Sequence, residues 1–436
     1  MDPIFFTIAL GAAGASGAAA DAYWIAYADS SSFIPSLCST TDSSGNVYTG
    51  CDFGSAFGIV QFDSDGQQQY AKNYANAYGA DPLAIDIDSS SNIYLAGIAS
   101  ASTGTGSSQC GIIKTTSAGA LSASKTFGDT AGFSEAANDV VVDGSSVYIA
   151  SRGNDSGGVA LFTITKMPTS LASITWERKL EVSGRNFFGE GVDVDSSGNV
   201  YVCGYGMDYP TYINQHMVIA KYNSSGTIQW QRVYHKSGTD VYGKSIAVDS
   251  SSNVYVSGTA GNDAILLKYN SSGALQWQRA LTPAGNANRN RAGCAVDSSG
   301  NVYLTNSITV SSNTHVLIAK YNSSGTIQWQ RSFGADGGYM TEKNIHIDSS
   351  DNLYITAPLQ IGSNSNNIVV AKLPNDGSLT GTYGDFSYAS SSATTSTPSN
   401  TSSTGGVTEA SHSTTFANAG MTATNKTGIT YSKEDL

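Results

Sequence analysis

The stretch DSSGNVY, residues Asp195–Tyr201, decides the fold of this chain because close variants of it recur along the sequence. The copies are spaced 46 to 55 residues apart and begin at Asp42, Asp88, Asp143, Asp195, Asp249, Asp297 and Asp348. A period of this length is typical of proteins built from one repeated supersecondary unit. Residues kept in every copy are explained by packing, so we expect any functional site in positions that the copies do not share.

The copy from Gly243 to Leu281 predicts four strands. β-branched and aromatic residues alternate or cluster in four stretches, 245–249, 253–258, 264–270 and 274–281, and turn residues bound each stretch. The linkers DSSGN and NSSG predict tight hairpin turns, because Asp and Asn side chains bond to their own backbone and Gly accepts positive φ. Four-stranded antiparallel sheets repeated without helices are typical of β-propeller blades. The fold class expected is therefore all-β, a seven-bladed β-propeller.

The tryptophans give a second periodic signal. Each lies 18 to 20 residues before the Asp of the next copy: Trp24, Trp176, Trp230, Trp277 and Trp329. This position falls in a fourth strand, so residues 22–28 form a fourth strand with no first three before it. We expect this N-terminal strand to complete the sheet that begins at Ile345 and to close the ring, which removes exposed sheet edges. Ser378–Phe386, with Gly381 at the tryptophan position, is expected to be a degenerate copy displaced outward, and Ser124 occupies the same position earlier in the chain.

The repeats resemble a known family. KYNSSGTIQWQR at Lys221–Arg232, followed by a variable loop and a DSSGNVY-like string, is similar to the SBBP-type β-propeller repeat over roughly residues 22–386. The resemblance implies a bacterial or viral protein that is secreted or displayed on a surface. Kelch and WD40 patterns fit less well, since neither a double-glycine motif nor a GH and WD pair is found.

Composition limits the function. Of the 436 residues only 13% are charged, about half the usual share, and the net charge is −12. The acidic balance argues against nucleic acid as a partner, since phosphate binding needs clustered Lys and Arg. Ten of the 22 basic residues instead sit at two repeat positions, where we expect packing roles: Lys114, Lys166, Lys221, Lys268, Lys320 and Lys372, and Arg178, Arg232, Arg279 and Arg331.

The five cysteines have no metal-ligand spacing. Cys203 and Cys294 replace small residues within predicted strands, where a thiol behaves as a small apolar group. Cys38 and Cys51 flank the first DSSGN turn on adjacent strands, so either a cross-strand disulfide or two free thiols fit the sequence.

The N-terminal segment, residues 1–20, is apolar and rich in Gly and Ala. The run Ile4–Leu10 is too short to span a bilayer. A cleaved secretory signal is one reading, but no Lys or Arg precedes the run and Asp2 does. The favoured reading is a retained assembly arm that buries Phe5, Phe6, Ile8 and Leu10 against another virion protein. Similar starts occur in virion proteins of marine bacteriophages, and this resemblance favours a virus particle.

The predicted domains are the arm at 1–20, the propeller at 21–387, a Ser/Thr-rich linker at 388–406 and a C-terminal tail or docking segment at 407–436. The linker is of low complexity and is expected not to fold, because it has little apolar surface to bury. The tail contains Phe416, Met421, Ile429 and Tyr431 in otherwise polar sequence.

The sequence predicts no catalytic, cofactor or metal site. Calcium prefers six to eight oxygen ligands, so the single repeated Asp of DSSGN is better explained as a turn residue. His216 and His315 lie at equivalent positions of separate blades, and the other histidines are scattered. No nucleophile, base and orienting acid can be assembled from the spacing, and no paired catalytic carboxylates are evident.

Unshared residues gather in two classes of connection that emerge on one face of a propeller, from the fourth strand to the next blade and from the second strand to the third. Aromatic rings beside amides and carboxylates suit a sugar-binding or protein-binding surface, although aromatic residues capping the barrel ends explain them equally. The ligand-face candidates are Phe187, Phe188, Tyr205, Met207, Asp208, Tyr209, Tyr212, Tyr234, His235, Asp240, Tyr242, Asn288, Arg289, Arg291, Tyr339 and Glu342.

Three functions remain open. The first is a non-enzymatic bacteriophage virion protein whose propeller, on the tail or capsid, adheres to host surface glycan or protein. The second is a secreted or surface-anchored bacterial binding module. The third, least favoured, is an enzyme acting on polysaccharide, because a fold alone supplies no mechanism.

Overall fold

The computed structural model describes residues 4–10, 23–28, 34–54, 56–75, 79–100, 108–128, 135–154, 158–181, 185–208, 215–236, 238–283, 292–341, 344–361, 367–383, 385–398, 401–403, 408–411, 415–418, 422–425 and 430–434. Within these ranges the regular structure is β throughout. No helix in this part of the chain has the length and apolar character needed to cross a membrane.

Five sheets each contain four strands that are consecutive in the chain and antiparallel. We name each group of four strands a unit, after its first strand. The units are β3 (Ile34–Thr41), β4 (Val47–Asp52), β5 (Phe57–Phe62) and β6 (Gln68–Ala75); β7 (Ala80–Ile87), β8 (Ile93–Ser100), β9 (Ser108–Thr115) and β10 (Leu121–Gly128); β11 (Ala136–Asp143), β12 (Ser146–Asn154), β13 (Ala160–Pro168) and β14 (Trp176–Glu181); β15 (Arg185–Val194), β16 (Val200–Asp208), β17 (His216–Tyr222) and β18 (Ile228–His235); and β19 (Val241–Val248), β20 (Val254–Ala260), β21 (Asp263–Tyr269) and β22 (Leu275–Thr282).

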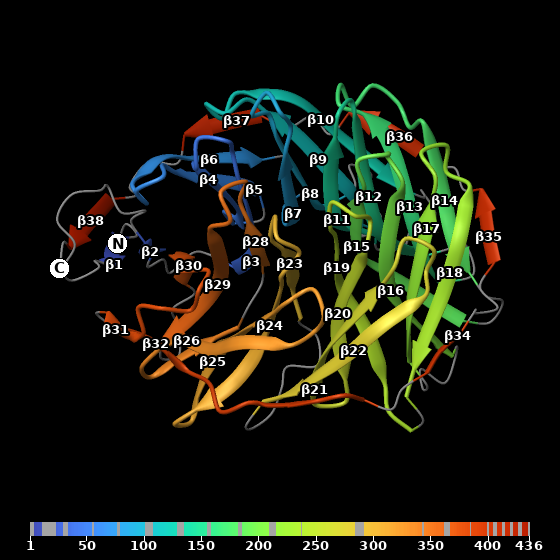
Figure 1. The fold of residues 1–436 in the computed structure, drawn as a ribbon. Coiled ribbons are helices and arrows are strands. Elements are labelled where there is room, and N and C mark those ends of the chain that lie inside the picture. Colours follow the sequence, from blue (N-terminus) through green and yellow to red (C-terminus); the bar gives the residue numbers. More distant parts are fainter. Residues whose placement is uncertain are drawn as a thin grey trace.

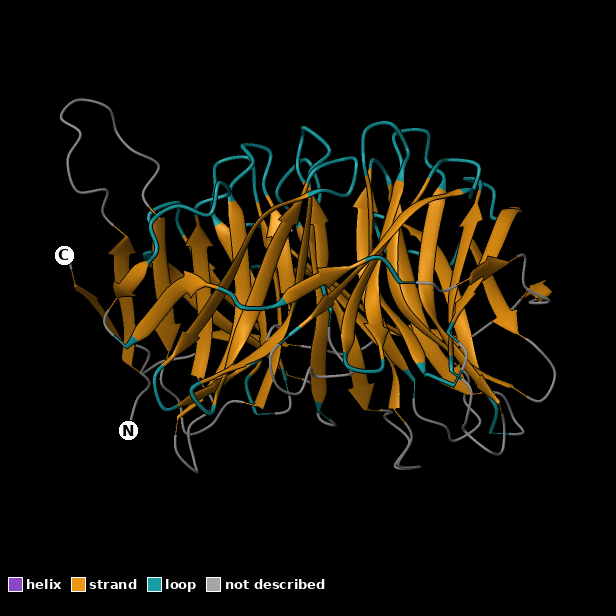
Figure 2. Cartoon of the chain, turned by 60° about the horizontal axis from the view of Figure 1, so that its bottom comes forward, coloured by secondary structure: helices purple, strands orange, loops and turns teal. Residues whose placement is uncertain are grey.

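A larger sheet holds two further units, which β27 (Gly338–Met340) joins by pairing with both. One consists of β23 (Cys294–Val296), β24 (Val302–Val310), β25 (Asn313–Tyr321) and β26 (Ile327–Ala335); the other consists of β28 (Asn344–Ile347), β29 (Leu353–Ile361), β30 (Asn367–Leu373) and β2 (Tyr23–Ala28). Figure 1 shows the units arranged around a common centre, with the first strand of each unit nearest that centre. In side view the strands run between two ends of the ring, where the loops gather (Figure 2).

The repeated Asp forms the turn between the first two strands of a unit, as predicted. One carboxylate oxygen of Asp42 accepts the backbone N–H groups of Ser44 and Asn46, each at 2.9 Å, and the other accepts the hydroxyl of Tyr48 at 3.1 Å. The same three bonds recur at Asp88, Asp195, Asp249, Asp297 and Asp348. The Tyr of the motif therefore anchors the turn, a role that the sequence pattern did not reveal.

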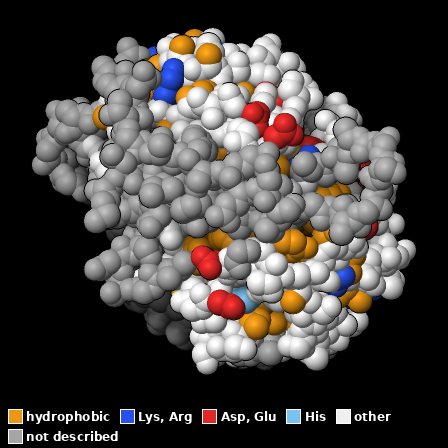
Figure 3. Space-filling model, turned by 90° about the vertical axis from the view of Figure 1, so that its left-hand side faces the viewer, with side chains coloured by type: hydrophobic (Ala, Val, Ile, Leu, Met, Phe, Trp, Pro, Cys, Tyr) orange, Lys and Arg blue, Asp and Glu red, His pale blue; other side chains and the backbone are white. Residues whose placement is uncertain are grey.

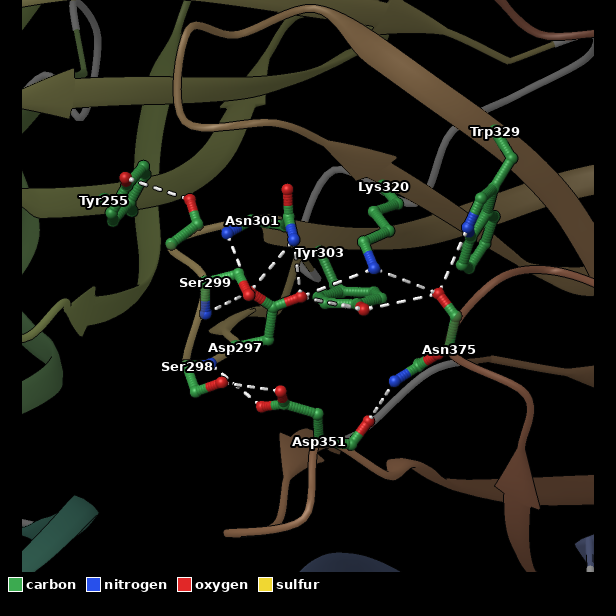
Figure 4. A network of polar contacts seen from close by, with 11 residues as sticks. Tyr255, Asp297, Ser298, Ser299, Asn301, Tyr303, Lys320, Trp329, Asp351 and Asn375 are labelled. Carbon is green, nitrogen blue, oxygen red and sulfur yellow. Dashed lines mark hydrogen bonds and ion pairs between the residues drawn. The ribbon is translucent and has the colours of Figure 1, made fainter.

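The repeat Trp, Lys and Arg residues bond to the neighbouring unit wherever these bonds are described, which confirms their packing role. Trp230 Nε1 donates to the carbonyl of Ser271 at 3.0 Å, and Arg232 Nε donates to that of Gly273 at 2.6 Å. Both carbonyls belong to the NSSG turn of the following unit. Gly273 has φ +77°, and a Cβ there would lie 2.7 Å from the Trp230 ring, so the turn requires glycine. Figure 4 shows the equivalent junction, where Lys320 and Trp329 donate to the carbonyl of Asn375.

The pairing of the strands changes the residue assigned to the tryptophan position in the β7 unit. Each tryptophan pairs with the repeat lysine of its own unit, for example Trp277 with Lys268. In the β7 unit, however, the residue opposite Lys114 is Ala123, and Ser124 is one position further on. The same register shift precedes this position in other units, so the shift is not the cause. Ala123 lies four residues after Gly119, as Trp230 does after Gly226, whereas counting back from the next turn Asp gives a position one residue too far.

The N-terminal strand β2 makes contacts with two units. β2 pairs antiparallel with β30, with Trp24 opposite Lys372. Trp24 is buried, and its Nε1 donates to the carbonyl of Ser64 in the β3 unit at 3.0 Å. The contact between the β28 and β3 units thus uses the same donor and the same kind of turn as the other junctions.

The N-terminal run forms a strand of the larger sheet. Ile4–Leu10 is β1, which pairs antiparallel with β2 and parallel with β38 (Thr430–Glu434). Both edges of its backbone are therefore paired within the chain, and burial of its side chains against a virion protein stays a prediction. The side chains of Phe5, Phe6, Ile8 and Leu10 lie outside the described part of the structure.

The Ser/Thr-rich tract also differs from expectation, since parts of it form strands. After the hairpin β31 (Gly381–Tyr383) and β32 (Phe386–Ser390), whose second strand pairs with β26, β33 (Thr394–Ser396) pairs with β22 and β34 (Thr401–Ser403) pairs with β18. An existing sheet edge supplies main-chain hydrogen bonds, and Thr favours strands, so such pairing needs no apolar core of its own. The tail continues as β35 (Thr408–Ser411) on β14, β36 (Thr415–Asn418) on β10 and β37 (Thr422–Asn425) on β6.

All five cysteines are buried, and none forms a disulfide. Cys38 pairs in register with Gly50, not with Cys51. Since neighbouring residues of a strand face opposite sides of the sheet, Cys51 packs with Val47 and Phe53 while Cys38 packs with Tyr48. The alternative of a disulfide between them is therefore wrong for this structure.

Candidate functional site

Four inner strands contain a register shift at the same place. The shifts lie between Pro82 and Ala84, Ala137 and Asp139, Gly189 and Gly191, and Gly243 and Ser245. The residue inserted at each shift is different, namely Leu83, Asn138, Glu190 and Lys244, and each lies five positions before the turn Asp of its unit. Such a bulge leaves one residue out of the ladder and redirects its side chain, and bulges are common beside binding sites.

All four inserted residues line one cavity of about 320 Å³ at the centre of the ring. Its walls come from the first strands of the units and the residues beside them: Cys38, Leu83, Ala84, Ile85, Asn138, Asp139, Glu190, Lys244, Ser245, Ala292, Gly293, Asn344 and Ile345. Ligand pockets have volumes of roughly 300–1,000 Å³. The cavity is thus large enough for a small polar group, such as one end of a longer ligand.

Lys244 is the centre of the charged part of this site. Its Nζ lies 3.0 Å from Glu190 Oε1, and both side chains are largely buried. The same ammonium lies 4.6 Å from the ring centroid of Tyr205 and 5.5 Å from that of Tyr242, distances at which a cation is attracted to an aromatic face. Burial raises the pKa of Tyr205, so its hydroxyl stays neutral and able to donate.

Three predicted ligand-face residues meet beside this ion pair. The rings of Phe188 and Tyr205 stack with centroids 4.9 Å apart, and Tyr242 meets Tyr205 edge to face, also at 4.9 Å. All three side chains are partly exposed. The structure therefore combines aromatic surface, an amide, a carboxylate and an ammonium in one place, which is what recognition of a sugar or a peptide requires.

Three aspartates on the inner strands connect neighbouring units. Asp193 accepts the N–H of Val248 at 2.7 Å, and Asp139 accepts the N–H of Val192 at 2.9 Å. Asp86 accepts the N–H of Val142 in the same way at 2.6 Å. Burial raises the pKa of Asp139 and Asp193 to about 7 and that of Asp86 to about 6, although the backbone hydrogen bonds oppose the change.

A second cavity of about 610 Å³ lies towards the Asp turns and includes Asp86, Asp193 and His346 in its walls. Burial lowers the pKa of His346 to about 4, and its ring stacks on Tyr354 at 4.8 Å. Ser39 Oγ lies 3.2 Å from His346 Nδ1, but it is also within 2.9 Å of Asn344 Oδ1. In the described part of the chain, no three His, Cys, Asp or Glu side chains are grouped so that they could hold a metal ion.

Two ligand-face candidates are core residues. Phe187 is 3% exposed and packs with Phe162 and Val202, and Tyr234 is fully buried beside Met217. Consecutive residues of a strand point to opposite faces, so only Phe188 of the Phe–Phe pair can face the cavity side. Because Phe187 and Tyr234 are both buried, their assignment to a ligand surface is corrected.

The remaining candidates are dispersed. His235 lies 5.8 Å from His216, ring to ring, Asp240 accepts the N–H of Gln215 at 3.3 Å, and Tyr339 is half exposed on β27. The side chains of Met207 and Asp208 are not described, and Tyr209, Tyr212, Asn288, Arg289, Arg291 and Glu342 lie outside the described residues.

The inserted residues were missed by the sequence analysis, although one signal marks them. Aligning the copies on the turn Asp and reading five residues back gives Leu83, Asn138, Glu190 and Lys244, a position at which size and charge change from copy to copy. The aromatic residues are concentrated in the loops, so the sequence predicts the ligand surface there.

Comparison with known proteins agrees with the repeat. Residues 236–263 match the SBBP family, described as a β-propeller repeat. The chain is a β-propeller. No curated protein matches its sequence. Among solved structures, the propeller is similar to a catalytically inactive virginiamycin B lyase from Staphylococcus aureus, with 12% identity, 80% of this chain and 100% of that chain covered, and a TM-score of 0.46. It is also similar to Trypanosoma rangeli sialidase, with 11% identity, coverage of 80% and 60%, and a TM-score of 0.42.

Proposed function

We propose that this protein is a non-enzymatic adhesion propeller of a bacteriophage particle, which binds glycan or protein on a host surface through the central cavity and its aromatic rim. In this proposal the ring has seven blades and β2 closes it. The pairing of β2 with β30 and the bond from Trp24 to Ser64 support the closure.

The binding role is proposed from the residues that occupy the bulge position. The shared residues of each unit are of one type and make the same bonds, whereas Leu83, Asn138, Glu190 and Lys244 differ in type from unit to unit and all line the cavity. Asn138 Nδ2 donates to the carbonyl of Gly189 at 2.6 Å and Lys244 pairs with Glu190, so these contacts also differ between units. Variation at one structural position inside a constant framework supports recognition, because packing would favour one residue type there.

The carboxylates of the cavity favour binding over catalysis. Glu190 pairs with Lys244, and Asp139 accepts backbone N–H groups from Val192 and Val140. A glycosidase needs one carboxyl group to donate a proton and a second to act as base or nucleophile. Within the described cavity Glu190 and Asp139 both hold neighbouring groups in place, and we assign them a positioning role in binding on this basis.

The particle location is supported by the N-terminal resemblance to marine phage virion proteins and by the sparse surface charge. On the face in Figure 3 charged side chains are few among uncharged ones. The SBBP repeat also favours the second candidate, a secreted or surface-anchored bacterial module. Mass spectrometry of the natural protein separates them: Met1 retained, or lost alone, supports the particle, and a start near Asp21 supports export.

A glycan array with labelled full-length protein tests the binding role, with host outer-surface protein extracts on the same slides. We expect at least one glycan or protein spot to bind the parent chain and to lose at least tenfold in affinity with Asn138→Ala or Lys244→Met. Gln229→Ala, an exposed change on an outer strand, is the matched control. No specific spot, or equal binding by all variants, contradicts the proposal, and cleavage of a bound glycan would establish the enzyme instead.

A further inference from the structure

The C-terminal segment contacts the outer strands in a constant register. Its strands pair with the fourth strands of successive units in reverse order along the chain, first β26 and last β6. The paired residues are Tyr388 with Phe333, Thr395 with Leu281, Ser402 with Tyr234, Glu409 with Leu180, Phe416 with Phe127, and Ala423 with Tyr74. On the segment these positions are seven residues apart.

The partners on the outer strands are equivalent to one another. Phe333, Leu281, Tyr234 and Leu180 each lie four residues after the tryptophan of their unit, and Phe127 and Tyr74 each lie four after Ala123 and Tyr70, which pair at the tryptophan position. Each seven-residue step therefore moves the segment from one outer edge to the same place on the next. Seven residues of extended chain reach at most about 25 Å, which provides a short strand and a connection.

The sequence of the segment carries the same period. The residue before each paired position is Ser387, Thr394, Thr401, Thr408, Thr415 and Thr422. Thr favours extended backbone, and a hydroxyl side chain can be left in solvent. Thr394, Thr395 and Ser396 are exposed, so pairing on β22 depends on the main chain. Tyr388, paired with Phe333 on β26, is instead buried.

We infer that residues 387–425 are a tandem array of seven-residue edge-strand ligands, and that the outer edges of β26, β22, β18, β14, β10 and β6 are equivalent binding sites for them. The occupant is this segment of the same chain, bound by β-augmentation. It covers edges that would otherwise offer unpaired N–H and C=O groups to other chains. On β26 the buried Tyr388 packs beside Phe333, which fixes the first repeat there. The repeats from Thr394 onward pair through the main chain, so any of these can occupy any of the other five edges.

The interchangeability of the repeats can be tested in the full-length protein. Deleting Thr401–Val407 removes one repeat, so the three later repeats move to β18, β14 and β10 and Thr430–Glu434 moves to β6, while β1 loses β38. Deleting Thr401–Thr404 removes four residues and breaks the register. Hydrogen exchange of the outer strands, measured by mass spectrometry, distinguishes the two variants.

We expect the seven-residue deletion to keep exchange in β18, β14 and β10 within threefold of the parent and to speed it at least tenfold only in β1. The four-residue deletion should speed exchange at least tenfold in β18 and the later edges. Equal protection in both variants, or equal loss in both, overturns the inference. A matched pair of insertions after Ser403, seven residues (TGGVTSS) against four, repeats the test without shortening the chain.

Discussion

The inner and outer edges of the sheets are both protected, but by different means. At the inner edge the protection is local and varied: aspartates accept N–H groups from the next unit, and bulges direct different side chains into the cavity. At the outer edge it is continuous and uniform, because one segment pairs with one strand after another in a constant register. The variable edge suits recognition, and the uniform edge suits assembly.

The largest effect is expected from Trp24→Ala, at the outer half of the β28 unit. The buried indole packs against the β3 unit and donates to Ser64, so its loss removes both a hydrogen bond and a large apolar contact. We expect the free energy of unfolding to fall by about 3–5 kcal/mol, as for buried aromatic residues in general. Denaturant unfolding followed by fluorescence measures it. A change below 1 kcal/mol would show that this junction does not hold the ring together.

A smaller effect is expected from pH at the inner edge. The folded-state pKa of Asp139 and Asp193, about 7, is above the unfolded value of about 3.8, so the folded state binds more protons between these pH values. Their contribution to stability is complete below pH 4 and is lost as the pH rises towards 7. Burial lowers the pKa of His346 to about 4, so the folded state binds fewer protons than the unfolded state between pH 4 and 6.5. The contribution of His346 to stability therefore increases as the pH rises through this range.

Asp193→Asn tests this assignment. We expect the free energy of unfolding of the variant to fall less steeply than that of the parent between pH 4 and 7. The two slopes should differ by up to ~1.4 kcal/mol per pH unit. Thermal unfolding at a series of pH values measures it, with Asp195→Asn as the control. Burial of the turn carboxylate of Asp195 acts to raise its pKa, but hydrogen bonds from Asn199 and Tyr201 outweigh this and lower the pKa. Its stabilisation is therefore lost only as the pH falls below about 4. Identical pH profiles for Asp193→Asn and the parent would contradict the assignment.

The smallest effect on stability is expected from the double substitution Glu190→Gln and Lys244→Met. Both partners of the ion pair change together, so no buried charge is left alone, and we expect the free energy of unfolding to change by less than about 1 kcal/mol. Ligand affinity should nevertheless fall at least tenfold in the array described above. A large loss of stability with unchanged binding would reverse the roles assigned to the two edges.

The parts of this fold that the sequence predicts are those in which one residue type does one job in every unit. The turn Asp, the Trp and the repeat Lys recur because each bonds to the same neighbour, so their spacing reveals the sheets and the contacts between them. The site is harder to predict because its residues occupy the same place in different units but are of different types. In addition, a bulge decides where the side chains of Glu190 and Lys244 point. The Ser/Thr tract misleads for another reason, since Thr394–Ser396 is stabilised by an edge that other residues provide.

The parallel pairing of β1 with β38 has a mechanical consequence. Both ends of the chain belong to one sheet, and Figure 2 shows them on the same side of the molecule. A force applied through the last residues would detach short strands one after another, each held by few hydrogen bonds, before it reached the tryptophan junctions. Such sequential release dissipates a pull in small steps and leaves the central cavity intact.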